Sequence, residues 1–272
     1  MLSFPNAKIN FGLYVTRKRD DGYHDLETFF YPVPYCDALE ILPAGNSGGT
    51  MALTGLPVAG DTEKNLVWKA YQLLLREYPG QVKPLDIHLH KVIPMGAGMG
   101  GGSADAAFML DMMNTHFGLG IDKETLGAYA LELGSDCPFF LLNKPAFAGG
   151  RGERLEPVAL DLSAYSIQIV CPSIHVGTAD AFRNIVPAPA GFDLRQLATL
   201  RPEDWRGRIA NDFEVPVFKL HPVLQTIKDQ LYAGGAVYAS MSGSGSSLYG
   251  IFPKGQRAVL DLPIVCSEHY CA

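Results

Sequence analysis

Apolar and polar residues alternate near the start of the chain. The odd positions of 7–15 are apolar, whereas Lys8 and Asn10 occupy even positions. A period of two is typical of a β-strand, so the pattern predicts a strand over 7–15 with Lys8 and Asn10 on the same face. The same alternation over 85–91 predicts a second strand, which Pro94 ends.

Other stretches have helical spacing or form short apolar runs. Apolar spacing, capping residues and small residues predict helices over 65–78, 103–113, 122–133 and 221–232, with shorter ones over 179–185 and 202–209. Short apolar runs predict strands over 37–42, 165–171, 237–241 and 247–252. The composition shifts after the glycine-rich turn at 149–152, so we expect a domain boundary near 150–165.

The composition excludes several classes of protein. The 272 residues are 47% apolar and 18% charged, which indicates a globular protein of one large or two smaller domains. A net charge of −6 argues against a nucleic-acid-binding protein. The uncharged run 230–253 is long enough to span a membrane, but its five glycines and five serines predict a loop between strands.

The first residues and the cysteines bear on location and on metal binding. No basic segment followed by an apolar one opens the chain, so we expect a cytoplasmic protein. The five cysteines form no C-x-x-C pair, which predicts free thiols rather than disulfides or a zinc site. His88 and His90 have no third ligand in a nearby motif, so we expect ordinary surface residues.

A cluster of glycines lies between the strand over 85–91 and the helix that begins near Ser103. Five of the seven residues in 96–102 are glycine, which removes the side chains that would block the close approach of a ligand. Because the loop leads into a helix N-terminus, its amides predict a phosphate-binding site. It is not a Walker A loop, since no lysine precedes Ser103, and the alternative is a flexible surface turn.

The run 94–107 resembles the phosphate loop of the GHMP kinases, the superfamily of galacto-, homoserine, mevalonate and phosphomevalonate kinases. Five further segments resemble motifs of this family, namely 5–10, 22–24, 134–140, 211–214 and 242–246. The resemblance covers residues 5–252. It departs from the family pattern at Met99, which replaces a usual leucine, and in the less typical segment 31–35.

The resemblance implies a two-domain α+β fold of the GHMP kinase type. An N-terminal, ATP-binding domain over 1–155 would be similar to domain 2 of ribosomal protein S5, and a ferredoxin-like C-terminal domain would cover 156–272. It also implies an ATP-dependent kinase that uses ATP and Mg²⁺, acts as a monomer or homodimer, and binds neither nucleic acid nor membrane. Segments 22–24 and 134–140 are most similar to the member that phosphorylates the 2-hydroxyl of methylerythritol linked to cytidine diphosphate.

The resemblance assigns individual residues to the site. For the nucleotide it implies Pro94, Met95, Gly96, Ala97, Gly98, Met99, Gly100, Gly101, Gly102, Ser103 and Ala104. For catalysis it implies Asp136, as the acceptor of the hydroxyl proton, and Lys8. For the substrate it implies Asn10, Tyr23, His24, Thr178, Phe182 and Gly243, with the cytosine between the rings of Tyr23 and Phe182. Asn65 and Lys91 precede the loop; we expect Asn65 to touch the nucleotide and Lys91 to be an exposed polar residue.

Each of these assignments has a plainer alternative. Asp136 would serve as a helix cap, and Lys8 would be a solvated residue on an edge strand. Tyr23 and His24 would pack within a loop, Phe182 in the core and Gly243 in a hairpin turn. At the level of the whole protein, the alternatives are another GHMP kinase of the homoserine or mevalonate type and a non-catalytic nucleotide-binding module.

Overall fold

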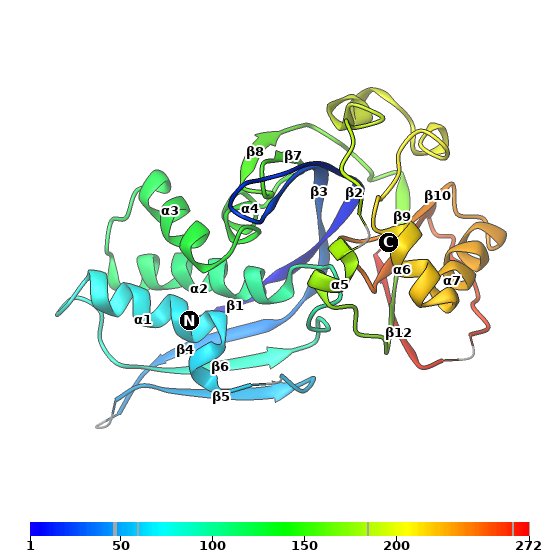
Figure 1. Ribbon diagram of the computed structural model, residues 1–272. Helices are drawn as coiled ribbons and strands as arrows, with labels where there is room; N and C mark the ends of the chain where they lie inside the picture. Colours follow the sequence, from blue (N-terminus) through cyan, green and yellow to red (C-terminus); the bar gives the residue numbers. More distant parts are fainter. Residues whose placement is uncertain (46–47, 59, 184, 263, 272) are drawn as a thin grey trace. The chain divides into compact units, whose positions relative to one another are not determined.

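The computed structural model describes residues 1–45, 48–58, 60–183, 185–262 and 264–271, without the side chains of 178 and 179 (Figure 1). The chain folds into two compact units. The first unit consists of Met1–Ala7, Pro34–Met95 and Gly100–Asn143, and the second of Lys8–Val33, Gly96–Met99 and Lys144–Ala272. Each unit combines several segments of the chain, so the units do not test the predicted domain boundary at residue 155, which stays a prediction.

The first unit contains a four-stranded sheet in the order β1-β4-β6-β5. Its strands are β1 (Leu2–Ser3), β4 (Ala38–Pro43), β5 (Thr50–Gly55) and β6 (Leu85–Lys91). Strand β6 pairs antiparallel with β4 and parallel with β5. The predicted alternation in β6 is confirmed, since Leu85, Ile87 and Leu89 are buried while His88 and His90 are exposed.

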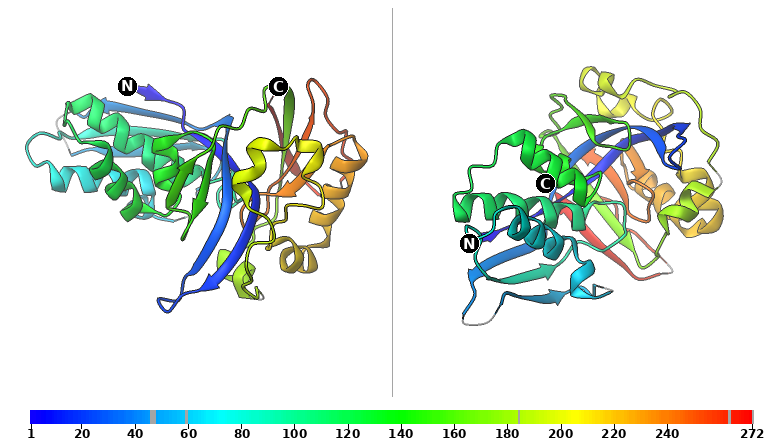
Figure 2. Two further views of the ribbon diagram at one scale, coloured as in Figure 1. Left: turned by 90° about the horizontal axis from the view of Figure 1, so that it is seen from above. Right: turned by 60° about the vertical axis from the view of Figure 1, so that its left-hand side comes forward.

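Helices α1 and α2 lie side by side on one face of this sheet (Figures 1 and 2). The helices of the first unit are α1 (Leu66–Glu77), α2 (Gly101–Phe117), α3 (Lys123–Leu133) and α4 (Cys137–Leu142), with a short 3₁₀ turn at Thr62–Lys64. The predicted cap at Asp122 is confirmed, and the structure adds a cap at Asn65. Asn65 accepts a hydrogen bond from Val67 at the start of α1, and Asp122 accepts one from Thr125 at the start of α3. Helix α2 begins two residues before the predicted Ser103.

The second unit contains two four-stranded sheets, in the orders β2-β3-β7-β8 and β10-β11-β9-β12. The first sheet consists of β2 (Asn6–Lys18), β3 (His24–Cys36), β7 (Ala146–Gly149) and β8 (Arg154–Pro157). The second consists of β9 (Tyr165–Pro172), β10 (Tyr238–Met241), β11 (Leu248–Pro253) and β12 (Cys266–Cys271). Figure 2 shows β2 and β3 as a long hairpin. Strands β3, β7, β8 and β12 were not among the predicted elements.

Helices α5 (Thr178–Arg183), α6 (Glu214–Leu220) and α7 (Pro222–Ala233) complete the second unit, with 3₁₀ turns at Leu194–Thr199 and Pro202–Asp204. Helix α7 packs its buried Leu224, Ile227 and Leu231 on β10 and β11. The predicted helix over 202–209 is wrong beyond the 3₁₀ turn that opens it. The mixture of helices and sheets confirms the α+β class. In the part of the chain that is described, no helix is long and apolar enough to cross a membrane, and the cysteines are thiols rather than disulfides.

Candidate functional site

The glycine loop ends in a helix N-terminus whose amides are available to a ligand. Gly100 caps α2 with a left-handed φ of 70°. The first helical hydrogen bond runs from the Ala104 amide to the Gly100 carbonyl, at 2.9 Å. The three N–H groups before it, at 101–103, therefore belong to the helix end that lacks intrahelical acceptors. Together with the helix dipole, they form the anion-binding geometry that the sequence predicts.

Two glycines of this loop also have packing reasons to be glycine. A Cβ on Gly98, which has a φ of 79°, would stand 2.0 Å from the carbonyl oxygen of Ser242. A Cβ on Gly101 would stand 2.9 Å from a methyl group of Ile93. Part of the glycine content therefore reflects close packing within each unit, in addition to access for a ligand.

The first turn of α2 lies against the segment that carries Asp136. The Oγ of Ser103 lies 3.8 Å from the point where a Cβ on Gly134 would stand. Ser103 also partly offsets the burial that raises the pKa of the Cys137 thiol to about 12. Such a thiol stays protonated and unreactive near neutral pH. Asp136 occupies the N-cap position of α4, yet its side chain makes no capping hydrogen bond. The fold thus gives Asp136 the position of a cap without the function of one.

A narrow pocket of about 90 Å³ lies beside the starts of α1 and α2. Its lining includes Asn65, Met95 and Gly102, which the sequence assigns to nucleotide binding. Asn65 Oδ1 accepts the 2.9 Å capping bond from Val67, which orients the side-chain amide. These three residues are separated in sequence but share one pocket of the first unit.

Lys91 also lines this pocket, and the expectation that it is exposed is wrong. Its side chain is 1% exposed and donates to Asp37 and, at 2.7 Å, to Asp105. Asp37 accepts further hydrogen bonds from the backbone amides of Val92 and Ile93. The sequence contained a signal for this burial, because position 91 continues the buried phase of 85, 87 and 89.

Asp105 completes this ionic cluster and was not predicted. Burial raises the pKa of Asp105 to about 7, against the opposing effect of Lys91. Its Oδ1 is buried and has no hydrogen-bond partner among the described residues. A carboxyl group with such a pKa lies inside the same pocket as Asn65 and Gly102.

Lys8 is held by a chain of neutral groups in the second unit. Its Nζ donates to Asn10 Oδ1 at 2.7 Å and lies 4.7 Å from the ring centroid of Phe30. Asn10 donates to Thr28 Oγ1 at 2.8 Å, and Thr28 donates to the Gly12 carbonyl at 2.6 Å. Lys8 and Asn10 are 4% and 2% exposed, so the alternative of a solvated edge-strand lysine is wrong.

The turn between β10 and β11 packs against the first part of the glycine loop. Ser242 donates to the Gly98 carbonyl at 2.8 Å, and a Cβ on Gly243 would stand 3.0 Å from the same oxygen. Asn211 donates to the carbonyls of Met241 and Gly243, each at 2.8 Å. The side chain of Asn211 therefore holds the turn at 242–246, and the Ser242 hydroxyl and the close packing of Gly243 hold Gly98.

The aromatic residues predicted for the substrate lie near one another in the second unit. The ring of His24 stacks on Phe182, with centroids 4.6 Å apart and an angle of 19°. Phe182 also meets the ring of Phe213 edge-on at 4.7 Å. Tyr23 is 56% exposed, and its ring contacts the guanidinium of Arg151. The ring stacked on Phe182 is therefore that of His24, while the side chain of Thr178 lies outside the described residues.

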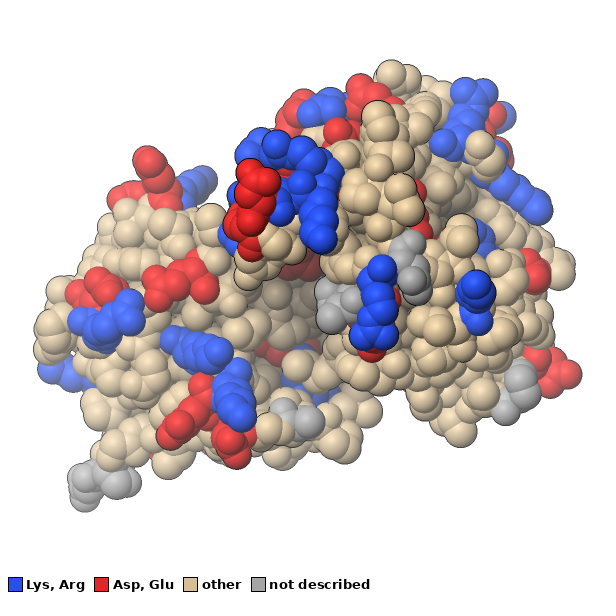
Figure 3. Space-filling view, viewed as in Figure 1, with Lys and Arg blue, Asp and Glu red and all other residues tan. Residues whose placement is uncertain are grey.

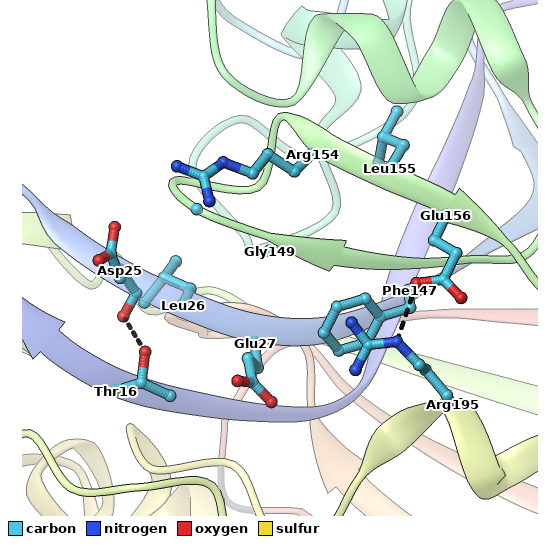
Figure 4. Close-up of a pocket in the computed structure, with 11 residues that line it drawn as sticks. Thr16, Asp25, Leu26, Glu27, Phe147, Gly149, Arg154, Leu155, Glu156 and Arg195 are labelled. Atoms are coloured by element: carbon cyan, nitrogen blue, oxygen red, sulfur yellow. Dashed lines mark hydrogen bonds and ion pairs between the residues drawn. The ribbon is translucent and has the colours of Figure 1, made fainter.

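A larger pocket of about 500 Å³ in the second unit has a different lining (Figure 4). Charged residues from β3, β8 and the turn at 194–199 surround it, among them Asp25, Glu27, Arg154 and Arg195. Arg195 pairs with Glu156 at 2.8 Å. No residue that the sequence assigned to the site is among its described lining residues.

Comparisons with known proteins agree with these motifs. Residues 65–144 match the GHMP kinases N terminal domain and residues 188–268 the GHMP kinases C terminal domain. The chain is 51% identical to the 4-diphosphocytidyl-2-C-methyl-D-erythritol kinase of Parabacteroides distasonis, over 93% of this chain and 92% of the relative. It is 50% identical to the enzyme of the same name from Bacteroides fragilis, over 94% of each chain.

Solved structures give the same assignment. A crystal structure of 4-(cytidine 5'-diphospho)-2C-methyl-D-erythritol kinase superposes with a TM-score of 0.76 at 36% identity, covering 92% of this chain and 90% of that one. The homoserine kinase from Cytophaga hutchinsonii superposes with a TM-score of 0.67 at 18% identity, covering 98% and 95%, which shows the shared fold. The expected two-domain GHMP kinase fold is confirmed. The chain belongs to the GHMP kinase family, among the relatives named 4-diphosphocytidyl-2-C-methyl-D-erythritol kinase.

Proposed function

We propose that this protein is the ATP-dependent kinase that phosphorylates the 2-hydroxyl of 4-diphosphocytidyl-2-C-methyl-D-erythritol, a step of isoprenoid precursor synthesis by the non-mevalonate route. The observation that carries the proposal is the contact between the first turn of α2 and the segment of Asp136. It brings an anion-binding helix end and a carboxylate into one region of the first unit. The names of the relatives at about 50% identity supply the substrate.

The residues at 94–104 would bind the phosphates of ATP. The amides at the start of α2 neutralise phosphate charge without a bound counterion, and the pocket beside Asn65 accepts another part of the nucleotide. Among the described residues, no group of three His, Cys, Asp or Glu side chains could hold a metal ion. Mg²⁺ would instead arrive with ATP and take one or two protein oxygens, for which the Ser103 hydroxyl is suited. Bound there, it would offset negative charge on the phosphates.

Asp136 and Lys8 would serve the transfer itself. An alcohol is a poor nucleophile, so the reaction needs an acceptor for its proton and a fixed position for its oxygen. Asp136 would accept the proton, because the segment that carries it lies against the first turn of α2, where the phosphates would bind. Lys8 and Asn10 would bind the polyol, since the Thr28 hydroxyl and the Gly12 carbonyl hold both side chains in place.

The cytosine base would bind at the rings of Phe182, His24 and Tyr23. A stacked base contributes about 1–3 kcal/mol in single-stranded nucleic-acid complexes, and the His24 imidazole adds a polar edge. Homoserine and mevalonate kinases resemble this chain at 12–18% identity, which shows fold alone and gives their substrates no support here. We further propose a cytoplasmic protein that acts as a monomer or homodimer.

The test is an ADP-release assay with the cytidylated polyol beside homoserine and mevalonate. We expect turnover with the cytidylated polyol alone. Asp136→Asn should abolish turnover while ATP binding, followed by equilibrium titration, stays within a few-fold of the unchanged protein. A protein that binds ATP but turns over none of the three alcohols would be a nucleotide-binding module, and the proposal would fall.

A further inference from the structure

Arg151 stands out among the basic residues of the second unit. It follows β7 in the turn that leads to β8, and its guanidinium carbon lies 4.9 Å from the ring centroid of Tyr23. The residue is half-buried. Nevertheless, its guanidinium makes no hydrogen bond and no ion pair with any described residue. Five N–H donors are therefore held against an aromatic face without an acceptor.

The neighbouring arginines are different, because they already form ion pairs with carboxylates. Figure 3 shows Lys and Arg side chains gathered over the turn between β2 and β3. Within this group, Arg17 pairs with Asp25 at 2.6 Å, and Arg19 pairs with Asp21 at 2.8 Å and with Asp25 at 3.1 Å. These pairs shape the turn and leave little capacity for a ligand. Arg151 differs from these two arginines, because its guanidinium lies against the ring of Tyr23, a residue predicted to bind the cytosine, and has no carboxylate at ion-pair distance among the described residues.

The turn that carries Arg151 is fixed beside Leu26, in the half-buried first part of β3. The Leu26 amide donates to the Gly150 carbonyl at 2.6 Å, which continues the pairing of β3 with β7. Glu153 accepts a hydrogen bond from the Arg151 amide at 2.5 Å. The backbone on both sides of Arg151 is therefore held, and a held guanidinium loses less conformational entropy when it binds an anion.

Strand β3 also gives the order of the substrate subsites. His24, at the base end, and Thr28, which holds Asn10, point to the same face and are separated by about 13 Å along an extended strand. Base, ribose, diphosphate and polyol follow one another in the cytidylated substrate. The diphosphate would therefore pass the middle of this stretch, where Leu26 is bonded to the turn of Arg151.

We propose that Arg151 binds the diphosphate of the substrate and selects acceptors that carry it. This inference rests on the proposed function, because it takes the cytidylated polyol as the substrate. A guanidinium offers two parallel N–H donors to a phosphate group, and the contact with the Tyr23 ring orients the guanidinium of Arg151. Arg151 is thus a specificity-determining residue that acts at a distance from the reacting hydroxyl.

The test compares Arg151→Gln with the matched variant Arg154→Gln. Arg154 lies in the same hairpin, is exposed and has no ion pair among the described residues, so its loss removes the same charge from the same region. For Arg151→Gln we expect the KM of the cytidylated substrate to rise roughly 10- to 100-fold, the loss typical of a charge-assisted hydrogen-bonded pair. The KM of ATP and the kcat should stay within about two-fold, and Arg154→Gln should match the unchanged protein.

Competitive inhibition by CDP and by cytidine shows which part of the substrate Arg151 binds, because CDP carries the diphosphate and cytidine does not. Arg151→Gln should raise the inhibition constant of CDP roughly 10-fold or more and leave that of cytidine unchanged, and Arg151→Lys should recover part of the loss. Equal changes for both ligands would show that Arg151 only supports the Tyr23 ring. Equal effects of the two glutamine variants would show a general charge effect, and either result overturns the inference. If the unchanged protein does not turn over the cytidylated polyol, it is the proposed function that fails.

Discussion

Two lysines are buried in the described part of the chain, one in each unit. Lys91 donates to the carboxylates of Asp37 and Asp105 in the first unit. In the second unit, Lys8 donates to the amide oxygen of Asn10 and lies over the ring of Phe30. Residue type and burial are the same for both lysines, and the groups that hold them are different.

We expect this difference to separate a structural charge, that of Lys91, from the proposed functional charge of Lys8. The two carboxylates accept hydrogen bonds from the ammonium of Lys91, and its positive charge is compensated within this buried cluster. Within the second unit, the groups seen to contact the ammonium of Lys8, the amide oxygen of Asn10 and the ring of Phe30, are neutral. Burial of a lysine therefore does not indicate a catalytic role. The charge of its partners is the better guide, and the predictions below test that distinction.

The largest effect should follow from Lys8→Met. We expect kcat to fall about 10²- to 10⁴-fold, because the variant loses the charge that we propose to bind the reacting hydroxyl. The loss of unfolding free energy should stay at about 1–3 kcal/mol, the cost of leaving the buried Asn10 Oδ1 without its donor, since methionine fills a similar volume. Steady-state kinetics and a melting curve on the same sample measure both quantities. A variant that melts early and loses activity in proportion would make Lys8 a structural residue like Lys91.

Lys91→Met should give the reverse result. Removal of the lysine leaves two buried carboxylates without their cation, which costs about 3–5 kcal/mol of unfolding free energy. Denaturant unfolding measures this loss. The double variant Lys91→Met with Asp105→Asn should regain part of it, because one uncompensated charge is removed as well. If the double variant is less stable than the single one, the cluster does not hold Lys91 by charge compensation.

The sequence predicted the position of most elements around these lysines, but it did not predict their partners. The period of two placed β6 correctly, and continuing the period by one step would have buried Lys91 as well. Its carboxylates stand 54 and 14 residues away along the chain. Only the tertiary fold brings them together, so no local pattern could identify the cluster.

The missed strand β3 has a local cause. Pro32 and Pro34 lack the amide that a sheet ladder needs, and they interrupt the alternation that would mark a strand. Missing β3 also obscured the side-chain directions at 23 and 24. Successive strand residues point to opposite faces, so the ring that stacks on Phe182 had to be found from the structure.

Thr28→Val tests the chain of hydrogen bonds that runs from Lys8 through Asn10 and Thr28 to the Gly12 carbonyl. The hydroxyl is 1% exposed, accepts from Asn10 and donates to the Gly12 carbonyl, so its removal leaves two buried groups unsatisfied. We expect a loss of about 2 kcal/mol in unfolding free energy and a smaller fall in kcat than in Lys8→Met. Thr28→Ser, which keeps the hydroxyl, is the control and should recover most of both. Equal kcat values for the valine and serine variants would show that the Thr28 hydroxyl does not help Lys8 in the reaction.

The smallest effect concerns the pH dependence that Asp105 gives the ionic cluster. Burial raises the pKa of Asp105 to about 7, above its value of about 3.9 in an unfolded chain. The folded protein therefore binds the extra proton more tightly, and this contribution to stability is present at low pH and lost as the pH rises through 7. Asp105→Asn is neutral at every pH and lacks this dependence.

Relative to the variant, the unchanged protein should lose about 1 kcal/mol of unfolding free energy between pH 6 and pH 7. Parallel stability curves for the two proteins over that range would mean that the carboxylate is already ionised at pH 6, with Lys91 outweighing the burial.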